Sequence, residues 1–134
     1  MILYKDGFLQ LDYNPTTDVL YTPCPDIHAD ELLHLHKAFS IIVETLKSYN
    51  IKYFLLDASQ SQTTVGEEEY FIVMEQLVQA LKETPLLKLA RVVSSSTMRE
   101  HKAAQFMTES KHLFPYAIQN FTSKEAALYW LKNQ

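Results

Sequence analysis

The chain has 134 residues, of which 47% are hydrophobic and 21% are charged, a composition typical of one globular domain. Twelve lysines and arginines against sixteen aspartates and glutamates give a net charge of −4, which argues against general nucleic-acid binding. The only glycines, Gly7 and Gly66, exclude glycine-rich phosphate loops, and the single cysteine, Cys24, excludes a disulfide framework and a multi-cysteine zinc site.

The first residues carry no signal-peptide pattern. Lys5 and Asp6 lie within the first six positions, and no apolar stretch of signal-peptide length follows them. No run of about 18 apolar residues occurs in the sequence, so no membrane-spanning helix is expected. A lone thiol suits a reducing compartment. Together these features predict a soluble, cytoplasmic protein.

The first 22 residues have the pattern of three short strands. Residues 2–5 and 8–13 are β-prone runs that flank Asp6-Gly7. This dipeptide favours a hairpin with a type I′ turn, in which both central residues have positive φ. Residues 18–22 form the third run, which prolines end.

The hydrophobic period then changes to three and four residues, which predicts an amphipathic helix from about residue 27 to residue 49. Asp26 stands where an N-cap is expected. Residues 51–57 read IKYFLLD, an apolar and aromatic run. Such a run indicates a strand that is buried on both faces, and we expect it at the centre of the sheet.

The remaining sequence predicts three more helices and two more strands. The helix starts are marked by residue pairs at capping-box spacing: Thr64 and Glu67, Thr97 and Glu100, and Thr122 and Glu125. Strands are expected at 87–94 and 117–121. The resulting order, β-β-β-α-β-α-β-α-β-α, predicts a single α/β domain over residues 1–134 with a mixed sheet, because strand–helix–strand alternation implies parallel pairing and the hairpin adds an antiparallel part.

This order, with LLDAS at 55–59 and FTSKEAALYWL at 121–131, resembles the SpoIIAA-like branch of the STAS superfamily, small bacterial proteins described as STAS/CRAL-TRIO-like. The resemblance covers nearly the whole chain and implies a STAS-like fold and a ligand-binding or interaction module with no established chemistry. In STAS anti-sigma-factor antagonists, the strand equivalent to 51–57 leads to an Asp-Ser-Ser-Gly-type loop whose serine is phosphorylated. Here the loop reads ASQSQTTVGEEE.

Two kinds of polar residue stand out around this loop. Asp57, at the end of the predicted strand, can bind a ligand hydroxyl or act as a general acid or base, or it can cap the loop amides that follow. A single carboxylate with no partner in the sequence argues against catalysis. Four hydroxyl groups can be phosphorylated in principle or can be turn residues: Ser59, Ser61, Thr63 and Thr64.

The carboxyl ends of parallel strands are where open α/β sheets bind ligands, which directs attention to the segment after the strand at 87–94. Three serines and a threonine lead into a helix there, and Arg99 lies in its first turn. Free N–H groups and a guanidinium can hold a phosphate or carboxylate, although the hydroxyls can also serve only as caps and Glu100 competes for the same N–H groups. The candidate ligand-binding residues are Asp57, Ser59, Ser95, Ser96, Thr97 and Arg99.

No metal site, cofactor or catalytic nucleophile is expected. His34 and His36 are two residues apart on a predicted helix and therefore point in different directions. Cys24 lies between two prolines, with no activating base nearby in the sequence.

The sequence thus predicts a non-enzymatic, STAS-like regulatory or protein-interaction domain. The alternative is a carrier for a small apolar or anionic ligand, bound at the strand ends. The aromatic residues of the N-terminal hairpin favour a homodimer, because small folds tend to bury such patches symmetrically. A protein partner is also expected, whereas nucleic acid and membrane insertion are not.

Overall fold

The computed structural model describes residues 1–94, 100–101, 104–105 and 114–133. The strands are β1 (Ile2–Lys5), β2 (Gln10–Asn14), β3 (Val19–Pro23), β4 (Tyr53–Asp57), β5 (Lys88–Val92) and β6 (Ala117–Phe121). The helices are α1 (Leu32–Ser48), α2 (Glu67–Ala80) and α4 (Lys124–Lys132), with the short 3-10 helices η1 (Ala29–Glu31) and η2 (Leu81–Glu83). The helix expected after Thr97 lies largely outside the described residues, although residues 100, 101, 104 and 105 are helical.

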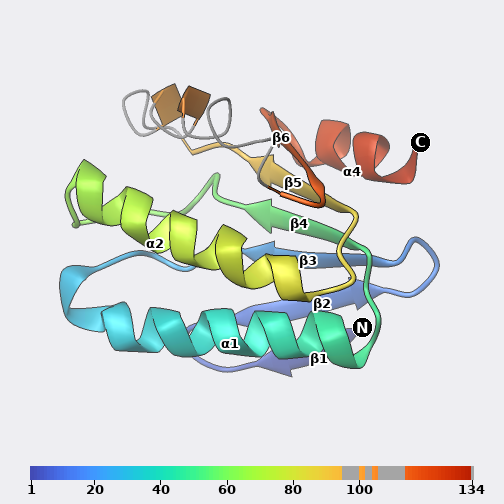
Figure 1. Ribbon diagram of the computed structural model, residues 1–134, viewed down its shortest axis with the longest axis horizontal. Helices are drawn as coiled ribbons and strands as arrows, with labels where there is room; N and C mark the ends of the chain where they lie inside the picture. Colours follow the sequence, from blue (N-terminus) through green and yellow to red (C-terminus); the bar gives the residue numbers. More distant parts are fainter. Residues whose placement is uncertain (95–99, 102–103, 106–113, 134) are drawn as a thin grey trace.

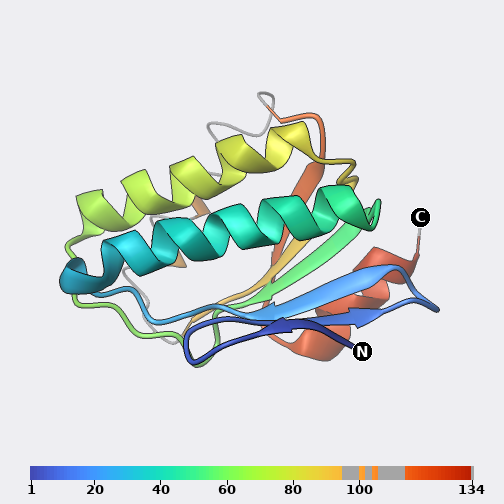
Figure 2. The same ribbon diagram turned by 90° about the horizontal axis from the view of Figure 1, so that it is seen from below.

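The six strands form one mixed sheet in the order β1-β2-β3-β4-β5-β6 (Figure 1). The pairs β1–β2 and β2–β3 are antiparallel, and the three later pairs are parallel. The prediction of a mixed α/β sheet with the 51–57 strand inside it is confirmed, since β4 lies between β3 and β5. Helices α1 and α2 lie over one face of the sheet and α4 lies over the other (Figure 2).

The face under α1 and α2 holds the larger core. Its side chains come from both helices and from every second position of the strands, as alternation along a strand requires. Fully buried members include Leu11, Leu20, Ile42, Leu46, Phe54, Leu77 and Leu81. Burying a side chain of this size stabilises the fold by about 1.5–3 kcal/mol, so this core provides most of the driving force.

The face under α4 holds a smaller core, which consists of Val19, Leu55, Ala90, Val92, Ala127 and Leu131. Helix α4 contacts β4, β5 and β6. Its N-cap is Ser123, whose Oγ accepts a hydrogen bond from the Ala126 N–H. The capping box expected from Thr122 is therefore wrong by one residue, because the extended conformation of a cap is adopted at Ser123.

The N-terminal hairpin differs from the prediction at its turn. Gly7 does not have positive φ, and the connection between β1 and β2 is longer than two residues. Asp6 Oδ1 instead accepts hydrogen bonds from the N–H groups of Phe8 and Leu9, each at 2.7 Å. An aspartate side chain that bonds the backbone two residues ahead makes its own turn, and the type I′ geometry is not needed.

The helix caps predicted at Asp26 and Thr64 are also wrong, because both side chains bond to a residue of another loop. Asp26 Oδ1 accepts from the Gln62 N–H at 2.9 Å, and α1 begins only at Leu32, after η1. Thr64 Oγ1 lies 3.1 Å from His28 Nδ1, and the N-cap of α2 is Gly66. The segments that leave β3 and β4 continue side by side beyond the sheet, so they bond to each other.

Candidate functional site

Asp57 is the last residue of β4, and hydrogen bonds from three donors surround its carboxylate. Oδ2 accepts from the Tyr21 hydroxyl at 2.7 Å, and Oδ1 accepts from the N–H and hydroxyl of Ser59 at 3.0 and 2.6 Å. Burial by itself would raise the pKa of Asp57, but these hydrogen bonds from Ser59 and Tyr21 outweigh it and bring the pKa below its ordinary value. Asp57 therefore stays ionised and caps the loop that follows it, which is one of the two roles that its position predicts.

Tyr21 and Lys124 complete what we call the Asp57 cluster, with Asp57 and Ser59. Burial and the contact with the Asp57 carboxylate both raise the pKa of Tyr21, so its hydroxyl remains a donor. Lys124, the first residue of α4, places its Nζ 3.9 Å from the centre of the Tyr21 ring. A cation held over a ring face is attracted by the ring quadrupole, so Tyr21 links the carboxylate of β4 to the ammonium of α4.

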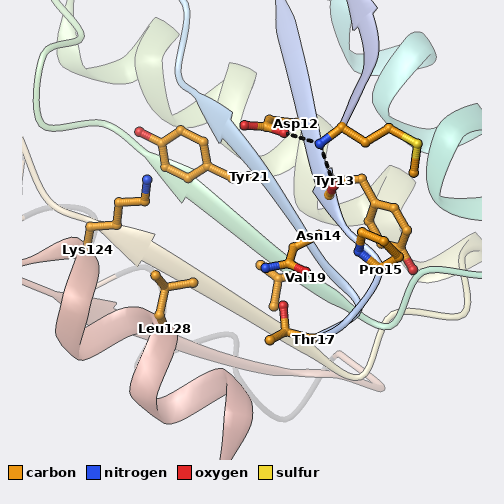
Figure 3. A pocket seen from close by; sticks show the side chains of 10 residues that line it. Asp12, Tyr13, Asn14, Pro15, Thr17, Val19, Tyr21, Lys124 and Leu128 are labelled. Atoms are coloured by element: carbon orange, nitrogen blue, oxygen red, sulfur yellow. Dashed lines mark hydrogen bonds and ion pairs between the residues drawn. The ribbon is translucent and has the colours of Figure 1, made fainter.

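A hollow of about 350 Å³ lies next to this cluster, between α4 and the strands β2 and β3 on the α4 side of the sheet (Figure 3). We call it the half-sheet hollow. Its lining residues are Met1, Asp12, Tyr13, Asn14, Pro15, Thr17, Val19, Tyr21, Lys124 and Leu128. Lys124 and Leu128 form the helical wall, and Asp12 lies across from them on β2. The hollow lies where α4, which packs mainly on β4–β6 and reaches β3 through Lys124, leaves β2 uncovered.

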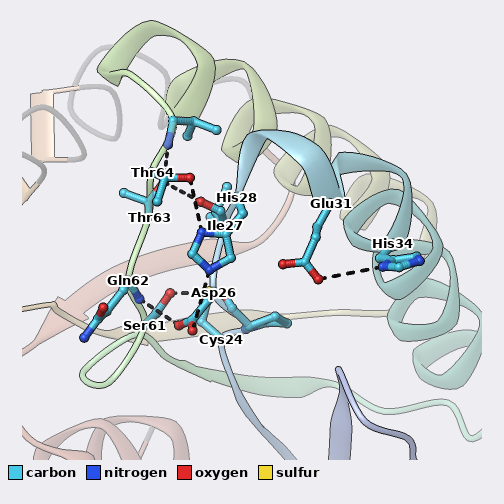
Figure 4. A network of polar contacts seen from close by, with 12 residues as sticks. Cys24, Asp26, Ile27, His28, Glu31, His34, Ser61, Gln62, Thr63 and Thr64 are labelled. Carbon is cyan, nitrogen blue, oxygen red and sulfur yellow. Dashed lines mark hydrogen bonds and ion pairs between the residues drawn. The ribbon is translucent and has the colours of Figure 1, made fainter.

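The four loop hydroxyls that the sequence singles out are all hydrogen-bonded within the chain. Ser61, which is buried, donates to the Pro25 carbonyl, and Thr63 donates to the Ile27 carbonyl (Figure 4). Ser59 bonds Asp57, as described above, and Thr64 contacts His28. These hydroxyl groups join the loop before α2 to the loop before α1. Thr64 is the only exposed residue of the four.

The predicted anion-binding residues Ser95, Ser96, Thr97 and Arg99 lie outside the described residues. Just before them, however, Arg91 of β5 projects from the α2 side of the sheet with only 5% of its side chain exposed. Its Nη2 donates to the Tyr70 hydroxyl at 2.9 Å and to Glu100 Oε2 at 3.0 Å, and its Nη1 donates to Glu100 Oε1 at 2.5 Å. Arg91 thus holds Glu100 through a two-pronged ion pair.

Ser94 completes what we call the Arg91 cluster, with Tyr70, Arg91 and Glu100. Its N–H and hydroxyl donate to Glu100 Oε2 at 2.8 and 2.5 Å. Burial would raise the pKa of Glu100, but the hydrogen bonds and charge of Arg91, helped by Ser94, lower it overall. The sequence analysis missed Arg91, although a cation inside the apolar run LLKLARVV was a visible signal.

In the described part of the chain, no three histidine, cysteine, aspartate or glutamate residues lie together as a metal site would require. No helix there is long and apolar enough to cross a membrane. Comparisons of the chain with protein-family models, with curated proteins and with solved structures gave no match. The fold defines a mixed α/β protein with one polar cluster on each face of its sheet.

Proposed function

We propose that this chain is a non-enzymatic, cytoplasmic regulatory or protein-interaction domain of the STAS type, and that it associates through the half-sheet hollow. The observation that carries the proposal is the incomplete cover of the α4 face, which leaves the hollow beside β2 and β3. Its walls combine the apolar side chains of Val19 and Leu128 with the charged side chains of Asp12 and Lys124. Most of the lining residues are polar or charged and Val19 is only 3% exposed, so the hollow has the mixed, largely polar character found at the rim of protein interfaces.

A second copy of the chain is the partner that this surface suits first. Asp12 and Lys124 lie across the same hollow. In a two-fold symmetric contact, residue i of one copy meets residue j of the other and the reverse. In the proposed dimer each Lys124 meets the Asp12 of the other copy beside Leu128, where Asp12 Oδ1 already accepts a hydrogen bond from the Met1 ammonium at 3.0 Å. The aromatic residues of the hairpin offer less surface for a dimer contact than the sequence suggests, because Tyr4, Phe8 and Tyr13 pack against the larger core.

The polar groups of the loops that follow β3 and β4 are hydrogen-bonded within the chain, which supports a regulatory role over a catalytic one. Asp57 and the hydroxyls of Ser59, Ser61 and Thr63 bond within the chain, where they fix the loops that follow β3 and β4. Thr64 is exposed, so it is the residue of this loop that a kinase would reach most readily. Phosphate there would lie beside His28 and before the first turn of α2, where negative charge is favourable.

A charge-swap series, analysed by sedimentation velocity at micromolar concentration, tests the self-association. We expect wild type to be a dimer, Lys124→Glu and Asp12→Lys each to be monomers, and the double variant to recover the dimer. Glutamate suits the first position of α4, which is the positive end of a helix, although it also brings a like charge toward Asp57. Thermal unfolding of each variant therefore accompanies the sedimentation runs, and a loss of the dimer counts only in a folded variant. Leu33→Glu on α1, where the leucine is 81% exposed, is the control and should remain a dimer. A monomeric wild type would contradict the proposal.

The size of the half-sheet hollow favours one second candidate, a carrier for a small anionic ligand. Its volume of about 350 Å³ falls in the range of small-molecule sites. Lys124 makes no ion pair with another described residue and could hold a ligand carboxylate or phosphate. Native mass spectrometry distinguishes the two functions. A small-molecule mass that wild type retains and Lys124→Ala loses would indicate the carrier, and a dimer without added mass would indicate the interaction domain.

A further inference from the structure

The Arg91 cluster lies on the opposite face of the sheet from the half-sheet hollow and has no part in the function proposed above. We propose that Arg91 and Ser94 form a binding site for a small anion, a phosphate or carboxylate group, at the carboxyl end of β5. Glu100 fills this site as a tethered competitor when no ligand is bound.

The donors around Glu100 recognise an anion and not a glutamate in particular. Two guanidinium nitrogens of Arg91 bond the two carboxylate oxygens in parallel, and the N–H and hydroxyl of Ser94 add two more hydrogen bonds. Phosphate and carboxylate groups both fit the fork of an arginine. The Glu100 carboxylate therefore marks the position and orientation that the acid group of a ligand would take.

Stability alone does not explain why this pair is buried. Removing two charges from water carries a large desolvation penalty, and apolar side chains of similar volume often stabilise a protein as well or better. Arg91 is nevertheless 5% exposed and lies one residue from the end of a parallel strand. The carboxyl ends of such strands are where open α/β sheets bind ligands.

A second observation next to Arg91 points to phosphate as the preferred ligand. Asn120 of β6 pairs with Arg91 in register, so the two side chains project from the same face of neighbouring strands, whose backbones run about 4.8 Å apart. The buried Oδ1 of Asn120 has no hydrogen-bond partner. The ionised Glu100 has no hydrogen to donate to this acceptor. A hydrogen phosphate has a P–OH group that can donate to Asn120 while its other oxygens accept from Arg91 and Ser94.

The test is to remove the competitor and titrate the protein with inorganic phosphate or with sodium acetate. The readout is the backbone amide resonance of Ser94 in wild type and in Glu100→Ala. We expect the resonance to move in the variant at a phosphate concentration at least about tenfold lower than in wild type. In wild type only the molecules whose Glu100 has left the site can bind phosphate, and a free fraction of about one tenth lowers the apparent affinity tenfold. Acetate should bind the variant more weakly than phosphate, since it cannot satisfy Asn120.

Three controls keep the test decisive. Glu75→Ala removes an exposed glutamate from α2 and should respond like wild type. Arg91→Met combined with Glu100→Ala removes the cation and should abolish the response. If Glu100→Ala does not fold, Glu100→Gln takes its place, and phosphate should raise its thermal midpoint more than that of wild type. An unmoved Ser94 amide in a folded variant, or an equal response without Arg91, would overturn the site, and tighter binding of acetate would overturn the role of Asn120.

Discussion

The polar clusters on the two faces of the sheet differ in how deeply they are buried. Under α1 and α2, the charge of Arg91 is buried in a large core and is balanced by Glu100, Ser94 and Tyr70. Under α4, a nine-residue helix covers only part of the sheet, and Asp57, Tyr21 and Lys124 lie at the border of an open hollow. Water reaches the second set readily, whereas in the first set it reaches the edge of the Glu100 carboxylate, which is 15% exposed, but hardly Arg91, which is 5% exposed.

This difference determines how each face can bind. On the α4 face a partner can make contact with groups that are already accessible, at little cost in rearrangement. On the α2 face, a ligand of the proposed anion site would have to replace the Glu100 carboxylate, which already accepts hydrogen bonds from Arg91 and Ser94. The comparison also predicts that equivalent substitutions cost more stability on the α2 face than on the α4 face.

The largest effect is expected from Arg91→Ala. We expect it to lower the free energy of unfolding by about 3–5 kcal/mol, because it leaves the Glu100 carboxylate partly buried without its counterion. Urea unfolding measures this loss. Replacing both members with apolar residues, as in Arg91→Met with Glu100→Leu, should recover most of the stability. A loss below about 1 kcal/mol, typical of a surface pair, would show that the two faces do not differ in this respect.

The two cores can be compared through matched leucines, Leu46 of α1 and Leu131 of α4, both of which are fully buried. Leucine-to-alanine substitutions in cores cost about 2–5 kcal/mol, and the cost grows with the cavity that remains. We expect Leu46→Ala in the upper half of this range and Leu131→Ala in the lower half, because short helix α4 can move toward the sheet. Urea unfolding of both variants provides the comparison, and the reverse order would contradict it.

The pH dependence of stability should reflect Glu100. Its pKa is lower in the folded protein than the unfolded value of about 4.3, so its contribution is present above that pH and is lost as the pH falls through the folded pKa. Each unit of lowering is worth about 1.4 kcal/mol. Glu100→Gln should therefore flatten the acid limb of the stability profile. Glu75→Gln, at an exposed position, should leave it unchanged, and an equal flattening in both would contradict the assignment.

The smallest difference is expected between two tyrosine hydroxyls. Tyr70→Phe leaves an Arg91 N–H without this acceptor in the core and should cost about 1.5–3 kcal/mol, the value for a bond to a charged group. Tyr21→Phe should cost only about 1 kcal/mol, because Asp57 keeps both bonds from Ser59 and water can replace the third. Thermal unfolding at neutral pH measures both. A larger loss in Tyr21→Phe would contradict the open character of the α4 face.

Most of the elements and the mixed sheet can be predicted from the amino-acid sequence. Hydrophobic period distinguishes strands from helices because burial repeats every two residues in one and every three or four in the other, and this local property placed β4 in the interior. The sequence also identified Asp57 as a strand-end residue. It erred on caps and turns, both where a distant group is the partner, as at Asp26, and where the neighbouring residue serves instead, as at Ser123.

The hydrogen-bond partners of several polar groups, in contrast, depend on how distant segments meet in the fold. Asp26 meets Gln62 and Tyr21 meets Asp57, each across 36 residues, and such pairings outweigh a cap or turn that is favoured locally. The half-sheet hollow likewise depends on how far α4 extends across the sheet. The burial of Arg91 depends on the packing of α2 over β5. No local pattern contains these distances, because each is set by two segments that meet only when the sheet is complete.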